Sequence, residues 1–225
     1  MTILQIQRRH ASLFRLRLGQ RDGKNPKRLV NEMRVTSPNR KVVDAFASVY
    51  GGRPKRWEDQ HEVFIPITRL PITLLPGKPL VQDMELWGSA GCTRRCDSVT
   101  MSDGSPCACG ADLPISEREC KPTSRLTFAC PEVPIVGVGM LTTHSEIAAA
   151  ELPAAIAIIE PVLAQNTPVR AILKVDQMAT PGHQFAVPRL EFEGLTFEDI
   201  ALAAASPPAL GPGVKPEPLA LGGGE

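Results

Sequence analysis

Five of the six cysteines in this chain of 225 residues fall close together, and their spacing indicates a metal site. The segment reads GCTRRCDSVTMSDGSPCACGADLPISEREC, with the pattern C-x3-C, ten residues, C-x-C, ten residues, C. The intervening residues include almost no apolar side chains, so the loop cannot build an ordinary core. The candidate metal ligands are Cys92, Cys96, Cys107, Cys109 and Cys120.

Clustered thiols in a cytosolic chain favour a metal over disulfides, because the cytosol keeps thiols reduced. Two close thiolate pairs that converge on one ion match the tetrahedral coordination of zinc, which here would be a structural cofactor. Zinc binding would contribute roughly 10–16 kcal/mol of apparent folding free energy to the loop. Five thiols exceed four positions, so one is a spare, a neighbour of the ligands or half of a disulfide. A disulfide pair and unligated thiols remain the alternatives.

Three arginines near the cysteines, Arg94, Arg95 and Arg118, would offset the negative charge of a thiolate site. The sixth cysteine lies in the apolar run TFAC. We expect this residue, Cys130, to be a small core side chain rather than a ligand.

No active site is predicted. His144-Ser145-Glu146 and Pro106-Cys107 match fragments of the zinc deaminase motif. Their order is reversed, however, and Cys107-Ala108-Cys109 has one intervening residue where two are required. The four histidines are scattered, and the Gly137–Gly139 run reads as packing within an apolar strand rather than a phosphate loop. We therefore expect a protein that is not an enzyme.

The formal net charge of +1 hides an uneven distribution along the chain. Residues 1–60 contain 14 Lys or Arg against 5 Asp or Glu, whereas residues 61–225 contain 11 against 19. Such a basic segment can contact nucleic acid, although the spacing of its charges also fits a solvated surface. Aromatic residues make up only 4% of the chain, which argues against a platform that stacks single-stranded bases.

The segment TSPNRKVVDAFASVYGG gives the clearest helix signal. Ser37 is expected to cap its N-terminus and Gly51 to end it. Val42, Phe46 and Val49 lie at helical spacing and are expected to face the core.

A second, longer helix is predicted to begin at Ser145, with a kink or split at Pro153. A short helix is predicted near Thr196 to Ala204. Strands are predicted over residues 13–18, 61–76, 80–87, 125–130, 136–142, 169–180 and 183–192. The last two form a hairpin around Pro181–Gly182, and the prolines within 61–76 indicate at least one edge strand.

These elements predict an α+β fold with a mostly antiparallel sheet, two main helices and an inserted cysteine-rich zinc-binding loop over residues 88–122. A single domain is expected over residues 12–205, between a flexible N-terminus (1–11) and a disordered Pro/Gly-rich tail (206–225). The chain has neither a cleavable signal pattern nor about 18 uninterrupted apolar residues. We expect a cytoplasmic protein without a membrane partner.

Several segments together resemble one known family. They are TSPNRKVVDAFASVYGGRPKRW, ELWGSAGCTRRCD followed by PCACG and ERECKPTSRL, GVGMLTTHSEIAAAELPAAIAII, VRAILKVD and FAVPRLEF. Over residues 34–192 the chain is similar to the recombination directionality factors of actinobacterial phages that encode large serine integrases. The run over residues 85–126 is the most specific part of this resemblance.

The resemblance implies a regulator in the bacterial host cell that performs no catalysis. Its partner would be the cognate large serine integrase, bound near the coiled-coil region of the integrase C-terminal domain. Binding would switch the integrase from integration to excision of the prophage, which recombines the hybrid attachment sites, and would inhibit the integrative reaction. The factor would reach attachment-site DNA only indirectly, through the integrase.

Two other classes of protein fit parts of the sequence. A zinc-stabilised nucleic-acid-binding or phage replication accessory protein would account for the cysteine cluster and the basic N-terminal third. A metalloenzyme is disfavoured, because a catalytic zinc site commonly includes His and none lies within the cluster.

Overall fold

The computed structural model describes residues 12–22, 25–28, 31–89, 91–110, 112–180 and 183–206. The predicted flexible N-terminus, residues 207–225 of the predicted tail and the turn at Pro181–Gly182 lie outside these residues. The described helices are α2 (Arg40–Tyr50), α3 (Glu146–Ala164), α4 (Phe197–Ala205) and the single 3-10 turn η1 (Ile115–Glu117).

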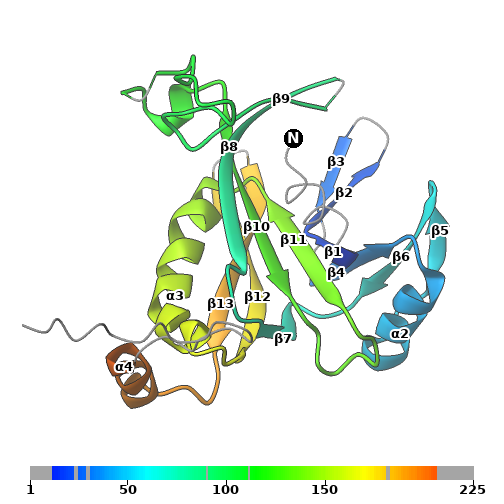
Figure 1. Cartoon of the computed structure of the whole chain (residues 1–225). Helices are drawn as coiled ribbons and strands as arrows, with labels where there is room; N and C mark the ends of the chain where they lie inside the picture. The colour runs from blue at the N-terminus through cyan, green and yellow to red at the C-terminus, as the bar shows by residue number, and fades with distance from the viewer. Residues whose placement is uncertain are drawn as a thin grey trace, which may run out of the picture.

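The strands form three sheets (Figure 1). The strands of the large sheet are β1 (Ser12–Arg17), β4 (Met33–Ser37), β5 (Lys55–Trp57), β6 (Gln60–Ile65), β8 (Leu80–Gly88), β9 (Gly91–Cys96), β10 (Lys121–Phe128) and β11 (Val138–Thr143). The three-stranded sheet contains β7 (Arg69–Leu74), β12 (Val169–Thr180) and β13 (His183–Phe192). The small hairpin contains β2 (Gly19–Asp22) and β3 (Asn25–Arg28).

The large sheet has the order β5-β6-β4-β1-β11-β10-β8-β9, and the three-stranded sheet has the order β13-β12-β7. All of the strand pairs are antiparallel except β1 with β11. The two sheets meet at a single backbone bridge between Thr73 of β7 and Ala129. The predicted α+β class with mostly antiparallel strands is confirmed, and β7, which carries Pro71, lies at a sheet edge as expected.

The core lies between the large sheet on one side and the three-stranded sheet and helices α2 and α3 on the other. Three rings meet there: the centroid of Phe14 is 4.8 Å from that of Phe46 and 6.0 Å from that of Phe128. A Cβ atom on Gly139 would lie 2.2 Å from the Phe14 ring, so only glycine leaves room for the ring. The interpretation of the Gly137–Gly139 run, which enters β11, as a packing feature is therefore confirmed. Cys130 is buried in the same core, also as expected.

Helix α2 begins later than the sequence predicts. Ser37 belongs to β4, where its hydroxyl donates to the carbonyl of Leu13, and Asn39 caps the helix by accepting from the amide of Lys41 at 3.0 Å. The expected core position Val49 was also wrong, because its side chain is 39% exposed. The helix instead buries Val43 beside the two other predicted positions, Val42 and Phe46.

Helix α3 runs without a break through Pro153, so the predicted split does not occur (Figure 1). A proline removes the hydrogen bond to the carbonyl four residues earlier, which here belongs to Ala149. Gln82 of β8 donates its side-chain amide to that carbonyl at 2.9 Å. The sheet therefore supplies the bond that the helix lacks. The predicted cap is confirmed, because Ser145 accepts from the amide of Ala148.

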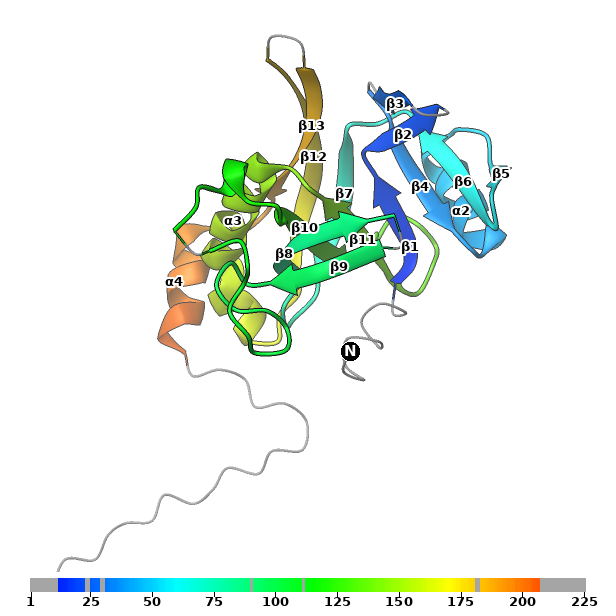
Figure 2. The same cartoon turned by 90° about the horizontal axis from the view of Figure 1, so that it is seen from above.

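Among the described helices, α3 alone is long and apolar enough to cross a membrane by length and composition. In the fold it packs against β8, β10, β12 and β13, and α4 lies against it (Figure 2). Its residues Ile159, Val162 and Leu163 belong to the same core cluster as Val43 and Phe46 of α2. Both long helices therefore cover one face of the large sheet.

A candidate metal centre and the arginine–carboxylate network beside it

The cysteine-rich segment begins as a strand that the sequence did not predict. Strand β9 pairs with β8 at the edge of the large sheet, with Cys96 opposite Met84 and Arg95 opposite Glu85. Because side chains alternate along a strand, Arg94 and Cys96 point to one face of the sheet and Arg95 to the other. This edge strand therefore presents a sulfur to one face and a charge to the opposite face.

Three thiols meet beneath β9. The Sγ atoms of Cys96, Cys107 and Cys120 all lie within 4.8 Å of one another, and all three residues are buried. This spacing is close enough for the three sulfurs to hold one metal ion.

The fourth candidate, Cys109, is buried in the same cluster. Its sulfur accepts hydrogen bonds from the backbone amide of Cys120 at 3.5 Å and from Nη1 of Arg94 at 3.6 Å. The fifth, Cys92, is only half-buried, and its thiol donates to the carbonyl of Arg94 at 3.2 Å. Cys92 therefore lies outside the group of three close thiols.

The thiols have different acidities. The amide of Cys120, helped by the neighbouring thiols, lowers the pKa of Cys109 to about 7. Burial is the main cause that raises the pKa of Cys120 to about 12, and it also raises the pKa of Cys96. Several thiolates can coexist at this depth only if a cation balances their charge. The donor set thus fits a soft divalent metal.

The sulfur cluster takes the place of an apolar core in this loop. Its apolar neighbours are Met84, Leu86 and Met101. By contrast, the loop side chains Val99 and Leu113 are 57% and 44% exposed, so they contribute little burial. The predicted absence of a conventional core in the loop is confirmed.

The three arginines near the cysteines have separate roles. Arg94 contacts the Cys109 sulfur, as expected of a counter-charge. Arg118 is buried and donates to the carbonyls of Leu113 and Ser98, which ties the two halves of the loop together. Arg95 points to the opposite face from Cys96 and pairs chiefly with Glu85, and among the thiols only Cys92 contributes to raising its pKa.

On the opposite face, Arg95 joins a network around Glu85, which is 1% exposed. Glu85 accepts from Arg95 at 2.7 Å, from Arg125 at 2.8 Å and from the Trp87 indole at 3.0 Å. Asp83 adds an ion pair to Arg125 at 3.1 Å. The network crosses β8, β9 and β10, and it therefore holds these three strands in register from the face opposite the thiols.

The two carboxyl groups in this network are shifted in opposite directions. Burial opposes the ionisation of Glu85, but its hydrogen bonds and ion pairs with Arg125 and Arg95 outweigh burial and lower its pKa. Burial raises the pKa of Asp83 despite the same arginines. No motif in the sequence indicates this network, because its residues come within contact distance only when the three strands pair.

The structure therefore combines an α+β fold with an inserted cysteine loop in which three close thiols could hold a metal ion. A family model described as Gp3-like, recombination directionality factor-like, matches residues 15–193. The chain belongs to this family, which is regulatory rather than catalytic. No curated protein and no solved structure matches the chain significantly.

Replacing Glu85 by Gln should lower the free energy of unfolding at pH 7 by roughly 3 kcal/mol, because two arginines lose a buried partner charge. The folded-state pKa of Glu85 is lowered, so its contribution is complete above the unfolded pKa of about 4 and is lost progressively as the pH falls through the lower folded-state pKa. Urea unfolding at pH 7 and at pH 3.5 measures both effects.

The matched control is Glu151→Gln, which removes a carboxylate that is also bonded twice by one arginine, Arg189, but is 43% exposed. Its cost should stay below about 1 kcal/mol. Equal losses of unfolding free energy in the two variants would show that the buried network contributes no more to stability than an exposed ion pair.

Proposed function

We propose that the loop holds one structural zinc ion through Cys96, Cys107, Cys109 and Cys120, and that Cys92 is the spare thiol. Four buried sulfurs from one short loop match the tetrahedral thiolate sites of zinc. The close approach of three of them, with the low pKa of the fourth, supports this assignment. The ion would supply positive charge and cross-links, and no reaction step.

The metal assignment predicts different outcomes for two Cys→Ser variants. Cys96→Ser removes a ligand, so zinc per chain should fall from about one to near zero and the melting temperature should drop by ten degrees or more. Cys92→Ser should keep both the zinc and the melting temperature. Elemental analysis and thermal unfolding of the purified proteins measure these quantities. A wild-type protein that folds fully without metal, or loss of zinc from Cys92→Ser, would contradict the assignment.

We further propose that this protein is a recombination directionality factor that binds a phage large serine integrase. On this proposal it contacts the coiled-coil region of the integrase C-terminal domain, promotes recombination of the hybrid sites and inhibits integration. The observation that carries the proposal is the family match over residues 15–193. Attachment-site DNA would be reached through the integrase.

Such a switch works as a population shift between two arrangements of the integrase arms. A bound factor favours one arrangement only by the difference between its affinities for the two. Changing a ratio of 1:99 into 99:1 requires about 5.5 kcal/mol, which several bound factors in one synapse can share. A rigid factor transmits such a preference better than a loose one, because less binding energy is spent on ordering it.

The direct test is recombination in vitro with the purified integrase of the same phage. Addition of this protein should raise the rate of recombination between the two hybrid sites at least tenfold over that of integrase alone. It should also lower the rate of integration. The rates of product formation on the two substrate pairs measure the switch. No change on either pair would contradict the proposal.

The second candidate function is that of a protein that binds nucleic acid by itself, and the same purified protein can be used to test it. It should bind free DNA with an affinity that falls steeply as salt is raised. A directionality factor should show little affinity for DNA until the integrase is present.

A further inference from the structure

A trough of about 1110 Å³ opens on the face of the large sheet opposite the helices. Strands β1, β8, β10 and β11 line it, together with Arg95 of β9 and residues 75–79 between β7 and β8. Along β1, Phe14 points into the core and Arg15 into the trough, and Leu126 and Arg125 divide in the same way on β10. The trough is therefore a face of the sheet that no described helix covers.

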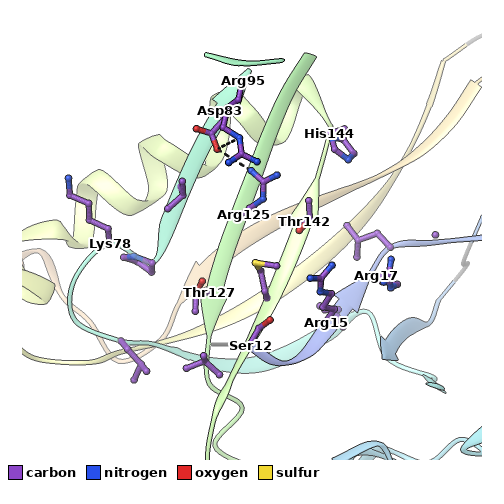
Figure 3. Close-up of a pocket in the computed structure, with 18 of the residues that line it drawn as sticks. Ser12, Arg15, Arg17, Lys78, Asp83, Arg95, Arg125, Thr127, Thr142 and His144 are labelled. Atoms are coloured by element: carbon purple, nitrogen blue, oxygen red, sulfur yellow. Dashed lines mark hydrogen bonds and ion pairs between the residues drawn. The ribbon is translucent and has the colours of Figure 1, made fainter. Parts of the chain in front are cut away.

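Two cations in the trough have no ion pair within the described part of the chain. Arg15 of β1 and Lys78 of the connection between β7 and β8 are exposed, and they lie on opposite sides of the trough (Figure 3). A third cation, Arg17, stacks on the Trp57 ring with its guanidinium carbon 5.0 Å from the centroid. Burial and the repulsion of Arg34 and Arg15 lower the pKa of Arg17, so a negative charge nearby would be favourable.

Two further cations are fixed in place. Arg95 and Arg125 meet Asp83 at one end of the trough, as the dashed lines of Figure 3 show for this group. Five cationic residues thus line the trough, against Asp83 as its one acidic lining residue and Glu85 buried behind it. The trough keeps an excess of positive charge after its internal ion pairs are counted.

The trough is also apolar along its floor and one side. Val81, Val138 and Met140 line the floor between the cations, and Leu75 on the side is 39% exposed. Trp87, near the C-terminal end of β8, also lines the trough and is 51% exposed, while its indole nitrogen donates to Glu85. A phosphate backbone would match the cations but would leave this apolar surface without a partner.

The chain outside the described residues has the wrong charge to occupy the trough. Residues 1–11 contain two arginines and no acidic residue. Residues 207–225 contain Glu217 and Glu225 against Lys215. Neither segment supplies the several carboxylates that would complement the cations of the trough, so an acidic occupant would come from another molecule.

We infer that the trough is the docking site for an acidic, amphipathic α-helix of a protein partner. An α-helix with side chains is about 10–12 Å across, and its apolar stripe would lie on the floor while flanking Asp and Glu meet the cations. Because the partner is taken to be the integrase, this inference rests on the proposed function and names the surface of this chain that makes the contact.

Charge reversal in the trough tests the inference. The variant with Arg15→Glu and Lys78→Glu loses no internal ion pair, so its urea midpoint should stay unchanged. Its affinity for the purified integrase at low salt should fall roughly 100-fold, because both sides of the trough then repel an acidic helix. The matched control carries Arg53→Glu and Arg170→Glu, two exposed residues outside the trough, and should change the affinity less than about threefold.

The outcomes separate the trough from the proposed function. If the wild-type protein fails to bind the integrase, the proposed function fails and the inference falls with it. If the wild-type protein binds and the trough variant binds equally well, or the control variant loses as much, only the trough assignment is overturned.

A cross-link identifies the occupant without depending on a loss of binding. A photoreactive benzoylphenylalanine replaces Thr127 on the trough floor of the full chain, and a control places it at exposed Glu160 of α3. In the presence of integrase and attachment-site DNA, the trough probe should capture an integrase peptide rich in Asp and Glu. Capture of DNA would overturn the inference in favour of a nucleic-acid groove, and capture of a peptide without acidic residues would also contradict it.

Discussion

The convergence of buried sulfurs beneath β9 is the constraint on which this end of the molecule depends. Residues 91–120 have few apolar side chains inside, since Val99, Leu113 and Ile115 are all largely exposed. A segment of this composition buries too little apolar surface to offset the entropy that it loses on ordering. On the proposed zinc assignment, thiols bound to one ion would remove that difficulty, because each metal–ligand bond would tie a distant part of the loop to the same point.

Strand alternation carries this constraint to the other face of the sheet. Cys96, the last residue of β9, points its side chain toward the other thiols. Its neighbour Arg95 points to the opposite face, where it lines the trough and bonds to Glu85. The edge strand therefore contributes Cys96 to the buried sulfur cluster on one face and Arg95 to the ion pair with Glu85 on the other. A disturbance of the cluster should move the wall of the trough, which links the stability of the loop to the surface proposed for the partner.

Local signals made much of the fold predictable. The β12–β13 hairpin, the cap at Ser145 and the role of Cys130 all depend on neighbours in sequence or on side-chain type, and each is confirmed. The cysteine cluster was visible for the same reason. Of the kink or split predicted at Pro153, the split does not occur, because Gln82, distant in sequence, donates a hydrogen bond to the carbonyl that the proline leaves free.

The strands β4, β5 and β9 and the small β2–β3 hairpin were not predicted. Strand β4 gives no clear strand pattern in the sequence, because its alternate residues Arg34 and Thr36 are polar and yet buried. Arg34 is buried as an ion pair with Glu62 and stacks on Trp57. The trough could not be predicted from the sequence either. Its cations come from separate strands and from the β7–β8 connection, which only the assembled sheet brings together. Such features follow from strand pairing and not from any local pattern.

Hydrogen exchange of the full-length protein before and after metal removal tests the central claim most directly. If the sulfur cluster holds the edge strand, removal of the metal by a chelator should greatly increase amide exchange over β9 and residues 97–120, while α2 and the β12–β13 hairpin remain protected. Unchanged protection of β9 in the metal-free protein would show that the strand holds itself in place, and would contradict the account.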